Sequence, residues 1–192
     1  MDRAWLRSAQ KLDFRDPARF LVNLRSLEAE ISASDTPKKI KNLRTSELKE
    51  WRELREGAIF CHGMGQRIGQ TVYIGKGESQ DYDFVASWVV GGEQHLAPVQ
   101  LKEVPPANLN PYSSLQDIVS ALTKYVDSRD LTVAIHLNRQ IRFDPDQIVT
   151  PSLKIAALWI FGALTSDQSI WGLWGNFLEE PQGLKFEYPI GN

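Results

Sequence analysis

The chain has 192 residues, of which 42% are hydrophobic and 24% are charged, a balance typical of a globular protein with one sizeable domain. The formal net charge of −2 excludes a basic character of the whole molecule, so any binding of nucleic acid must come from a local basic patch. Cys61 is the sole cysteine, which excludes an intramolecular disulfide and a zinc site built from cysteines.

The sequence has no pattern of a membrane span or a secretion signal. The most apolar run, residues 155–164, is too short to cross a bilayer, which takes about 20 residues. The first residues carry scattered charges and no apolar core of signal-peptide length. We therefore expect a cytoplasmic protein without a membrane partner.

Residues 1–45 are expected to form a helical extension followed by a linker. Apolar residues recur at helical spacing up to Ile31, and Asp16-Pro17 is typical of a helix start. We interpret residues 33–44 as a connecting loop whose basic run is solvated, with a phosphate contact as the alternative. That run consists of Lys38, Lys39, Lys41 and Arg44.

Residues 46–192 are expected to form one α/β domain that begins with a long helix capped by Ser46. Small residues recur every four positions along this helix, which predicts a close approach of its backbone to a sheet or another helix. These residues are Gly57, Cys61, Gly65 and Gly69.

Strands and further helices are expected to follow this helix. Three strands come first, with a Gly91-Gly92 hairpin turn between the second and the third, over residues 71–74, 82–90 and 95–104. A helix, a buried strand, an apolar helix and a last strand are expected over residues 114–126, 131–137, 153–164 and 170–177. This order predicts a mixed central sheet flanked by helices on both faces.

Three polar side chains stand out in the expected hairpin. Asp83 lies near the start of an apolar strand, and Gln100 and Lys102 lie two positions apart on the next strand. Since strand side chains alternate, Gln100 and Lys102 share one face of the sheet. Pairing of the two strands would bring Asp83 beside them.

A carboxylate, an amide oxygen and an ammonium at one place suit the hydrolysis of a phosphodiester with a hard divalent cation. Asp83 would supply charge to the cation, and Gln100 Oε1 or the backbone carbonyl of Leu101 would supply neutral oxygen. Lys102 would orient the attacking water or neutralise the phosphate. The sequence therefore predicts a catalytic metal site between these strands.

The element order over residues 46–138, with Tyr82-Asp83 and Gln100-Leu101-Lys102 on neighbouring strands, resembles the PD-(D/E)XK nuclease superfamily in its Q-x-K variant. The resemblance implies a restriction-endonuclease-like αβββαβ core and an Mg²⁺- or Mn²⁺-dependent endonuclease, a hydrolase acting on DNA rather than RNA. It also implies a carboxylate on the first core helix, for which Glu56 is the first choice and Glu53 the second. A homodimer would allow both strands to be cut.

The sequence departs from the family pattern at two positions. Tyr82 stands in place of the proline, and Gln100 in place of a carboxylate, which weakens the charge on the metal. A catalytically inactive member of the same fold, acting as a protein- or nucleic-acid-binding module, is therefore the alternative function. In that case Asp83 would be an ordinary turn carboxylate.

Other polar and aromatic residues have mainly structural interpretations. Glu78 could join the metal ligands, but a polar turn is favoured. His62 and His136 are interpreted as structural histidines. The aromatic C-terminal segment is expected to pack in the core, with base stacking or a protein interface as the alternative. Its residues include Trp159, Trp171 and Trp174.

Overall fold

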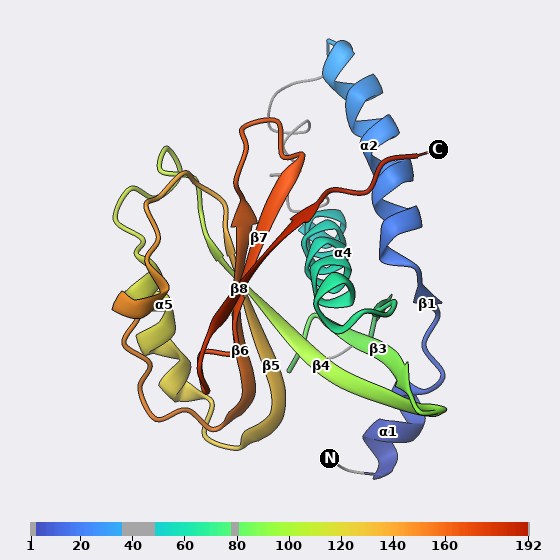
Figure 1. Cartoon of the computed structure of the whole chain (residues 1–192), viewed down its shortest axis with the longest axis vertical. Coiled ribbons are helices and arrows are strands. Elements are labelled where there is room, and N and C mark those ends of the chain that lie inside the picture. Colours follow the sequence, from blue (N-terminus) through green and yellow to red (C-terminus); the bar gives the residue numbers. More distant parts are fainter. Residues whose placement is uncertain (1–2, 36–48, 78–80, 192) are drawn as a thin grey trace.

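The computed structural model describes residues 3–35, 49–77 and 81–191. The predicted Ser46 cap, the basic run of residues 38–44 and Glu78 lie outside these ranges. Within the described residues the chain is a mixed α/β protein with one eight-stranded sheet, in which the strands follow one another in sequence order (Figure 1). The predicted α/β class with a mixed sheet is therefore confirmed.

The first half of the chain forms three antiparallel strand pairs, in which β1 pairs with β2, β2 with β3 and β3 with β4. Helix α4 precedes β2 along the chain. The bounds are α1 Arg3–Ala9, β1 Phe14–Arg15, α2 Pro17–Ala33, α4 Lys49–Ile68, β2 Tyr73–Gly75, β3 Phe84–Val90 and β4 Glu93–Val104.

The second half begins with a crossover through α5, after which β5 runs parallel to β4 and β6 parallel to β5. Strands β7 and β8 return to antiparallel pairing. The bounds are α5 Leu115–Ala121, β5 Ser128–Leu137, β6 Ile155–Ala163, β7 Ile170–Gly175 and β8 Gln182–Glu187, with 3₁₀ turns at Leu122–Lys124 and Pro145–Gln147.

Helices α4 and α5 cover opposite faces of the sheet, as predicted (Figure 1). Alternation along β5 shows the division, because Ala134 packs in the core under α4 while Val133 and Ile135 pack in the core under α5. On β4, Val99 and Leu101 belong to the α4 core. Gln100 between them, and Lys102 after them, therefore face the α5 side.

The N-terminal segment packs against the rest of the fold and is not one continuous helix. Strand β1 interrupts it and pairs with β2. Asp16 caps α2, its carboxylate accepting from the N–H groups of Ala18 and Arg19 at 2.8 and 3.2 Å, and Pro17 occupies the first turn, as predicted. Helix α2 contacts α4, and α1 covers the β3–β4 hairpin through Ala9.

The prediction of a helix over residues 153–164 is wrong, because this segment forms strand β6. Trp159 and Phe161 pack under α4, whereas Leu158 and Ile160 pack on the other face. A strand buried on both faces shows no polar alternation, so its apolar run resembles that of a buried helix. The predicted helix over residues 114–126 is shorter, since α5 ends at Ala121 and a 3₁₀ turn follows.

The small residues of α4 allow the predicted close approach to the sheet. A Cβ on Gly57 would lie 2.8 Å from side-chain atoms of both Ile74 and Phe84. Gly69 has a different role, because its φ of +73° ends the helix in the left-handed region that favours glycine. Among the described residues, no helix is both long and apolar enough to cross a membrane.

Replacing the Asp16 cap should destabilise the fold. Asp16→Ala leaves two N–H groups of α2 without their acceptor and should lower the free energy of unfolding by about 1 kcal/mol. Asp16→Asn keeps a side-chain oxygen and should retain most of the stability. Urea unfolding followed by circular dichroism measures both variants. Equal losses in the two variants would contradict a capping role.

Candidate functional site

Asp83 directly precedes β3, at a point where the neighbouring strand β4 continues beyond the start of β3. The β3–β4 register starts at the pair Phe84–Val99, so the last residues of β4 have no partner on β3. The Asp83 N–H donates to the carbonyl of Val99 at 2.9 Å. Its carboxylate Oδ2 then accepts from the Leu101 N–H at 2.6 Å. The side chain of Asp83 thus pairs with the next backbone group of β4, where a strand would otherwise continue.

Gln100 completes this arrangement. Its Nε2 donates to the same Oδ2 of Asp83 and lies 3.4 Å from the Leu101 carbonyl oxygen. The N–H and C=O of one strand residue point to the same side, so the Leu101 carbonyl faces the Asp83 carboxylate. The structure therefore brings together the three predicted oxygen-bearing groups, namely those of Asp83, Gln100 and Leu101.

Lys102 lies on the same face as Gln100, and both line a pocket of about 1070 Å³ between α1, β4 and the start of β5. The Lys102 side chain is half-buried, and within the described parts of the chain no carboxylate forms an ion pair with it. An ammonium without a protein counter-ion can meet an anionic group that enters the pocket.

Tyr125 connects Asp83 electrostatically to this pocket, which it also lines. Burial raises the pKa of the Tyr125 phenol, Lys124 beside it lowers that pKa, and the negative charge of Asp83 raises it. The Lys124 ammonium lies 5.5 Å from the centre of the Tyr125 ring. Gln100, which lines the pocket, donates to the Asp83 carboxylate, so that carboxylate lies beside the pocket.

The pocket wall carries charges of both signs. Its cations are Lys102, Lys124 and Arg129, and its carboxylates are Asp81, Asp127 and Asp130. This wall alone is not a uniformly basic surface for a polyanion. Aromatic side chains of Trp5 and Tyr82, in edge-to-face contact at 6.2 Å, complete the lining.

Glu56 lies apart from the Asp83 group. It lies on the buried face of α4, and its Oε1 is 3.3 Å from Nδ1 of His136 on β5. His136 and Glu103 are neighbours in the β4–β5 register, and both face α4. Since Gln100 and Lys102 face the α5 side, the sheet separates Glu56 from them. The second choice, Glu53, forms an ion pair with Lys49 at 3.3 Å on the helix surface.

No motif in the sequence indicates Glu103 as a site residue, and the sequence favours a structural role for His136. Glu103 follows Lys102 directly, so its alternation to the other face was readable from the strand pattern. Its position beside His136 depends on the β4–β5 register, which no local sequence pattern specifies.

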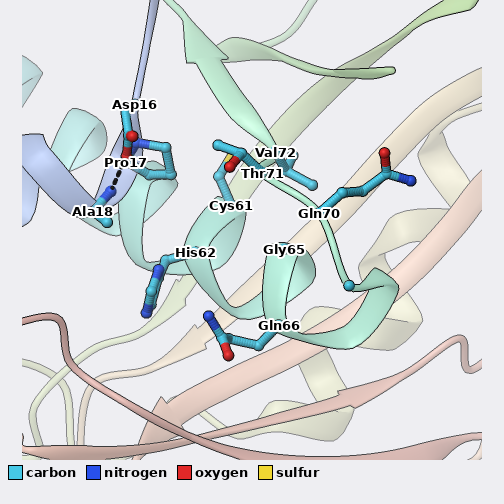
Figure 2. A pocket seen from close by; sticks show the side chains of 11 residues that line it. Asp16, Pro17, Ala18, Cys61, His62, Gly65, Gln66, Gln70, Thr71 and Val72 are labelled. Atoms are coloured by element: carbon cyan, nitrogen blue, oxygen red, sulfur yellow. Dashed lines mark hydrogen bonds between the residues drawn. The ribbon is translucent and has the colours of Figure 1, made fainter. Parts of the chain in front are cut away.

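A second pocket, of about 410 Å³, lies between α2 and α4 and contains Cys61 and His62 (Figure 2). The two side chains point in different directions, Cys61 towards Thr71 and His62 away from it. Burial raises the pKa of the Cys61 thiol far above its usual range, so the thiol stays protonated. Burial lowers the pKa of His62, although its contact with the Glu187 carbonyl opposes this. This pair is not an activated nucleophile and base.

Comparison of the chain with family models, curated proteins and solved structures finds no match. The function must therefore be inferred from the groups of the site. Asp83, Gln100 and the Leu101 backbone lie together beside the pocket that Lys102 lines. This arrangement is the best candidate for a catalytic site.

Proposed function

We propose that the protein is a metal-dependent nuclease that hydrolyses phosphodiester bonds, in DNA rather than RNA, with Mg²⁺ or Mn²⁺ held beside Asp83. The observation that carries the proposal is the contact of the Asp83 carboxylate with Gln100 and the Leu101 backbone at the start of β3. The order α4, antiparallel β2–β3–β4, α5 and parallel β5 supports a restriction-endonuclease-like core.

The donor set fits a hard divalent cation. Among the described residues, both hydrogen bonds to the Asp83 carboxylate end on Oδ2, which leaves Oδ1 as the oxygen for a cation. The Leu101 carbonyl oxygen lies 3.4 Å from Gln100 Nε2, which donates to the Oδ2 of the same carboxylate. Turning the Gln100 amide about its last side-chain bond exchanges its NH₂ for Oε1. Three oxygen ligands of this kind, completed by water, are what Mg²⁺ and Mn²⁺ prefer.

Each residue of the proposed site then has its own role. Asp83 and Gln100 hold the cation, which when bound supplies an activated water and stabilises the negative charge on the phosphate. Lys102, on the Gln100 face, binds a phosphate oxygen or orients the attacking water. Lys124 and Arg129 hold the flanking phosphates, and Trp5 and Tyr82 offer rings to unpaired bases.

The hydrogen-bond pattern also supports a second candidate function. The Gln100 amide and the Leu101 N–H both satisfy Asp83 Oδ2, so the carboxylate could serve only to close the end of the hairpin. The protein would then be a catalytically inactive binding module with the same fold.

Cleavage assays separate these functions. Plasmid and single-stranded oligonucleotide should be cut with Mg²⁺ or Mn²⁺ and left intact with a chelator. Asp83→Ala and Lys102→Ala should each lower the rate at least about 100-fold, because Asp83 holds the cation and the positive charge of Lys102 stabilises the transition state. Lys185→Ala, which removes an exposed lysine on β8, is the matched control and should keep the wild-type rate.

Two results would contradict the nuclease proposal. Cleavage that survives both Asp83→Ala and Lys102→Ala would have to come from another site or another protein. Binding of DNA without cleavage, unchanged by either substitution, would favour the inactive binding module.

Magnesium should stabilise the wild-type protein through the same site. At a concentration 100 times its dissociation constant, a bound ion adds about 2.7 kcal/mol to the free energy of unfolding. Asp83→Asn keeps the size and an accepting oxygen of the side chain but removes its charge, so the Mg²⁺-dependent rise in melting temperature should disappear. Differential scanning fluorimetry measures the rise. An equal rise in both proteins would show that Mg²⁺ binds elsewhere.

A further inference from the structure

A second group of ionisable side chains lies under α4, on the face of the sheet opposite the Lys102 pocket. Glu56, Glu103 and His136 each offer one ligand atom, and these atoms lie within 4.8 Å of one another. Glu103 and His136 are register neighbours on the parallel strands β4 and β5, so their side chains leave the sheet side by side. Glu56 reaches them from the helix above.

The buried ring nitrogen of His136 is independent evidence that this group binds a ligand. The residue is 4% exposed, and its Nδ1 is buried without a hydrogen-bond partner among the described residues. Oε1 of Glu56 is 3.3 Å away, near enough for an ion pair, but the geometry is not that of a hydrogen bond. A buried ring nitrogen without a partner costs free energy unless something binds it.

The ring of His136 is held in this orientation by its aromatic neighbours. It stacks on Phe161 with a centroid separation of 5.0 Å and an interplanar angle of 14°, and it packs against Trp171 at 5.7 Å. Both rings belong to the core under α4. Because the core fixes the ring, Nδ1 is held in place beside the two carboxylates.

The charges of this group favour a cation. Glu56 is 4% exposed, and the Arg52 guanidinium on the same helix lies 4.0 Å from its Oε1. Glu103 is half-buried and accepts a hydrogen bond from Asn138 Nδ2 at 2.7 Å. A carboxylate as buried as that of Glu56 is expensive unless positive charge lies beside it.

We propose that Glu56, Glu103 and His136 bind one divalent transition-metal ion, of the Zn²⁺ type, which ties α4 to β4 and β5. Two carboxylate oxygens and an imidazole nitrogen suit such an ion better than Mg²⁺, which takes oxygen ligands. Ligands about 2.1 Å from a tetrahedral metal are about 3.4 Å apart, close to the 3.3 Å between Nδ1 and Oε1. Asn138 orients the Glu103 carboxylate from behind.

The alternative for the same residues is a protonated His136 that forms a buried ion pair with Glu56. That pair needs no metal, and Glu103 contributes little to it. Metal binding and the ion pair therefore differ in two measurable ways, the uptake of an ion and its dependence on Glu103.

The test uses the full chain with Asp83→Ala, which removes the main ligand of the proposed magnesium site. Co²⁺ is added to the chelator-treated protein as a spectroscopic stand-in for Zn²⁺. One equivalent should bind with visible d–d bands, Zn²⁺ should displace it, and Zn²⁺ should raise the melting temperature. No retained Co²⁺ and no Zn²⁺-dependent stabilisation would overturn the proposal, whatever the outcome of the cleavage assays.

Variants identify the ligands. In the Asp83→Ala background, Glu103→Gln and His136→Gln should each weaken Co²⁺ binding at least about tenfold. Glu187→Gln, which changes an exposed carboxylate on β8, is the matched control and should leave binding unchanged. Glu103→Gln is the decisive variant, because its half-buried position spares the core if His136→Gln fails to fold. Binding that is unaffected by Glu103→Gln would overturn the site.

Discussion

The start of β3 at Phe84, opposite Val99 of the longer strand β4, is the constraint on which the candidate active site depends. Strand β4 continues past the pair Phe84–Val99, so its next backbone groups on that edge face no strand. Exposed strand edges need partners, and here the Asp83 carboxylate takes the Leu101 N–H. The carbonyl of the same residue is left facing the carboxylate. Because this part of β4 lacks a neighbouring strand, oxygen atoms of Asp83 and Leu101 lie together beside the pocket.

The second organising feature is the alternation of side chains along β4. Gln100 and Lys102 project to the α5 side, whereas Glu103 projects to the α4 side. One strand therefore contributes to two ionisable groups with the sheet between them. The Asp83 group borders an open pocket, and the Glu56 group is largely buried. This difference in solvation favours a hydrated hard cation at the first and a tightly enclosed borderline metal at the second.

The sequence predicted the parts of the fold that local patterns control. Asp16-Pro17 marked a helix start, and Gly91-Gly92 marked a hairpin whose turn residues have φ of +58° and +86°. Period two placed Gln100 and Lys102 on one face. The sequence did not reveal β6, because a strand covered on both faces has no polar alternation.

The remaining parts of the candidate sites depend on tertiary structure. Glu56 was expected beside Asp83 but lies under the opposite face, because the rotation of α4 about its axis is set by packing against the core. The parallel register that joins Glu103 to His136 is likewise not a local property. Strand β5 has parallel partners on both sides, so neither pairing can form through a tight turn. Such pairings require the closure of long loops, which slows folding relative to a helical bundle of the same length. During synthesis or refolding, Glu103 and His136 are therefore brought together only after the parallel β4–β5 pairing has formed.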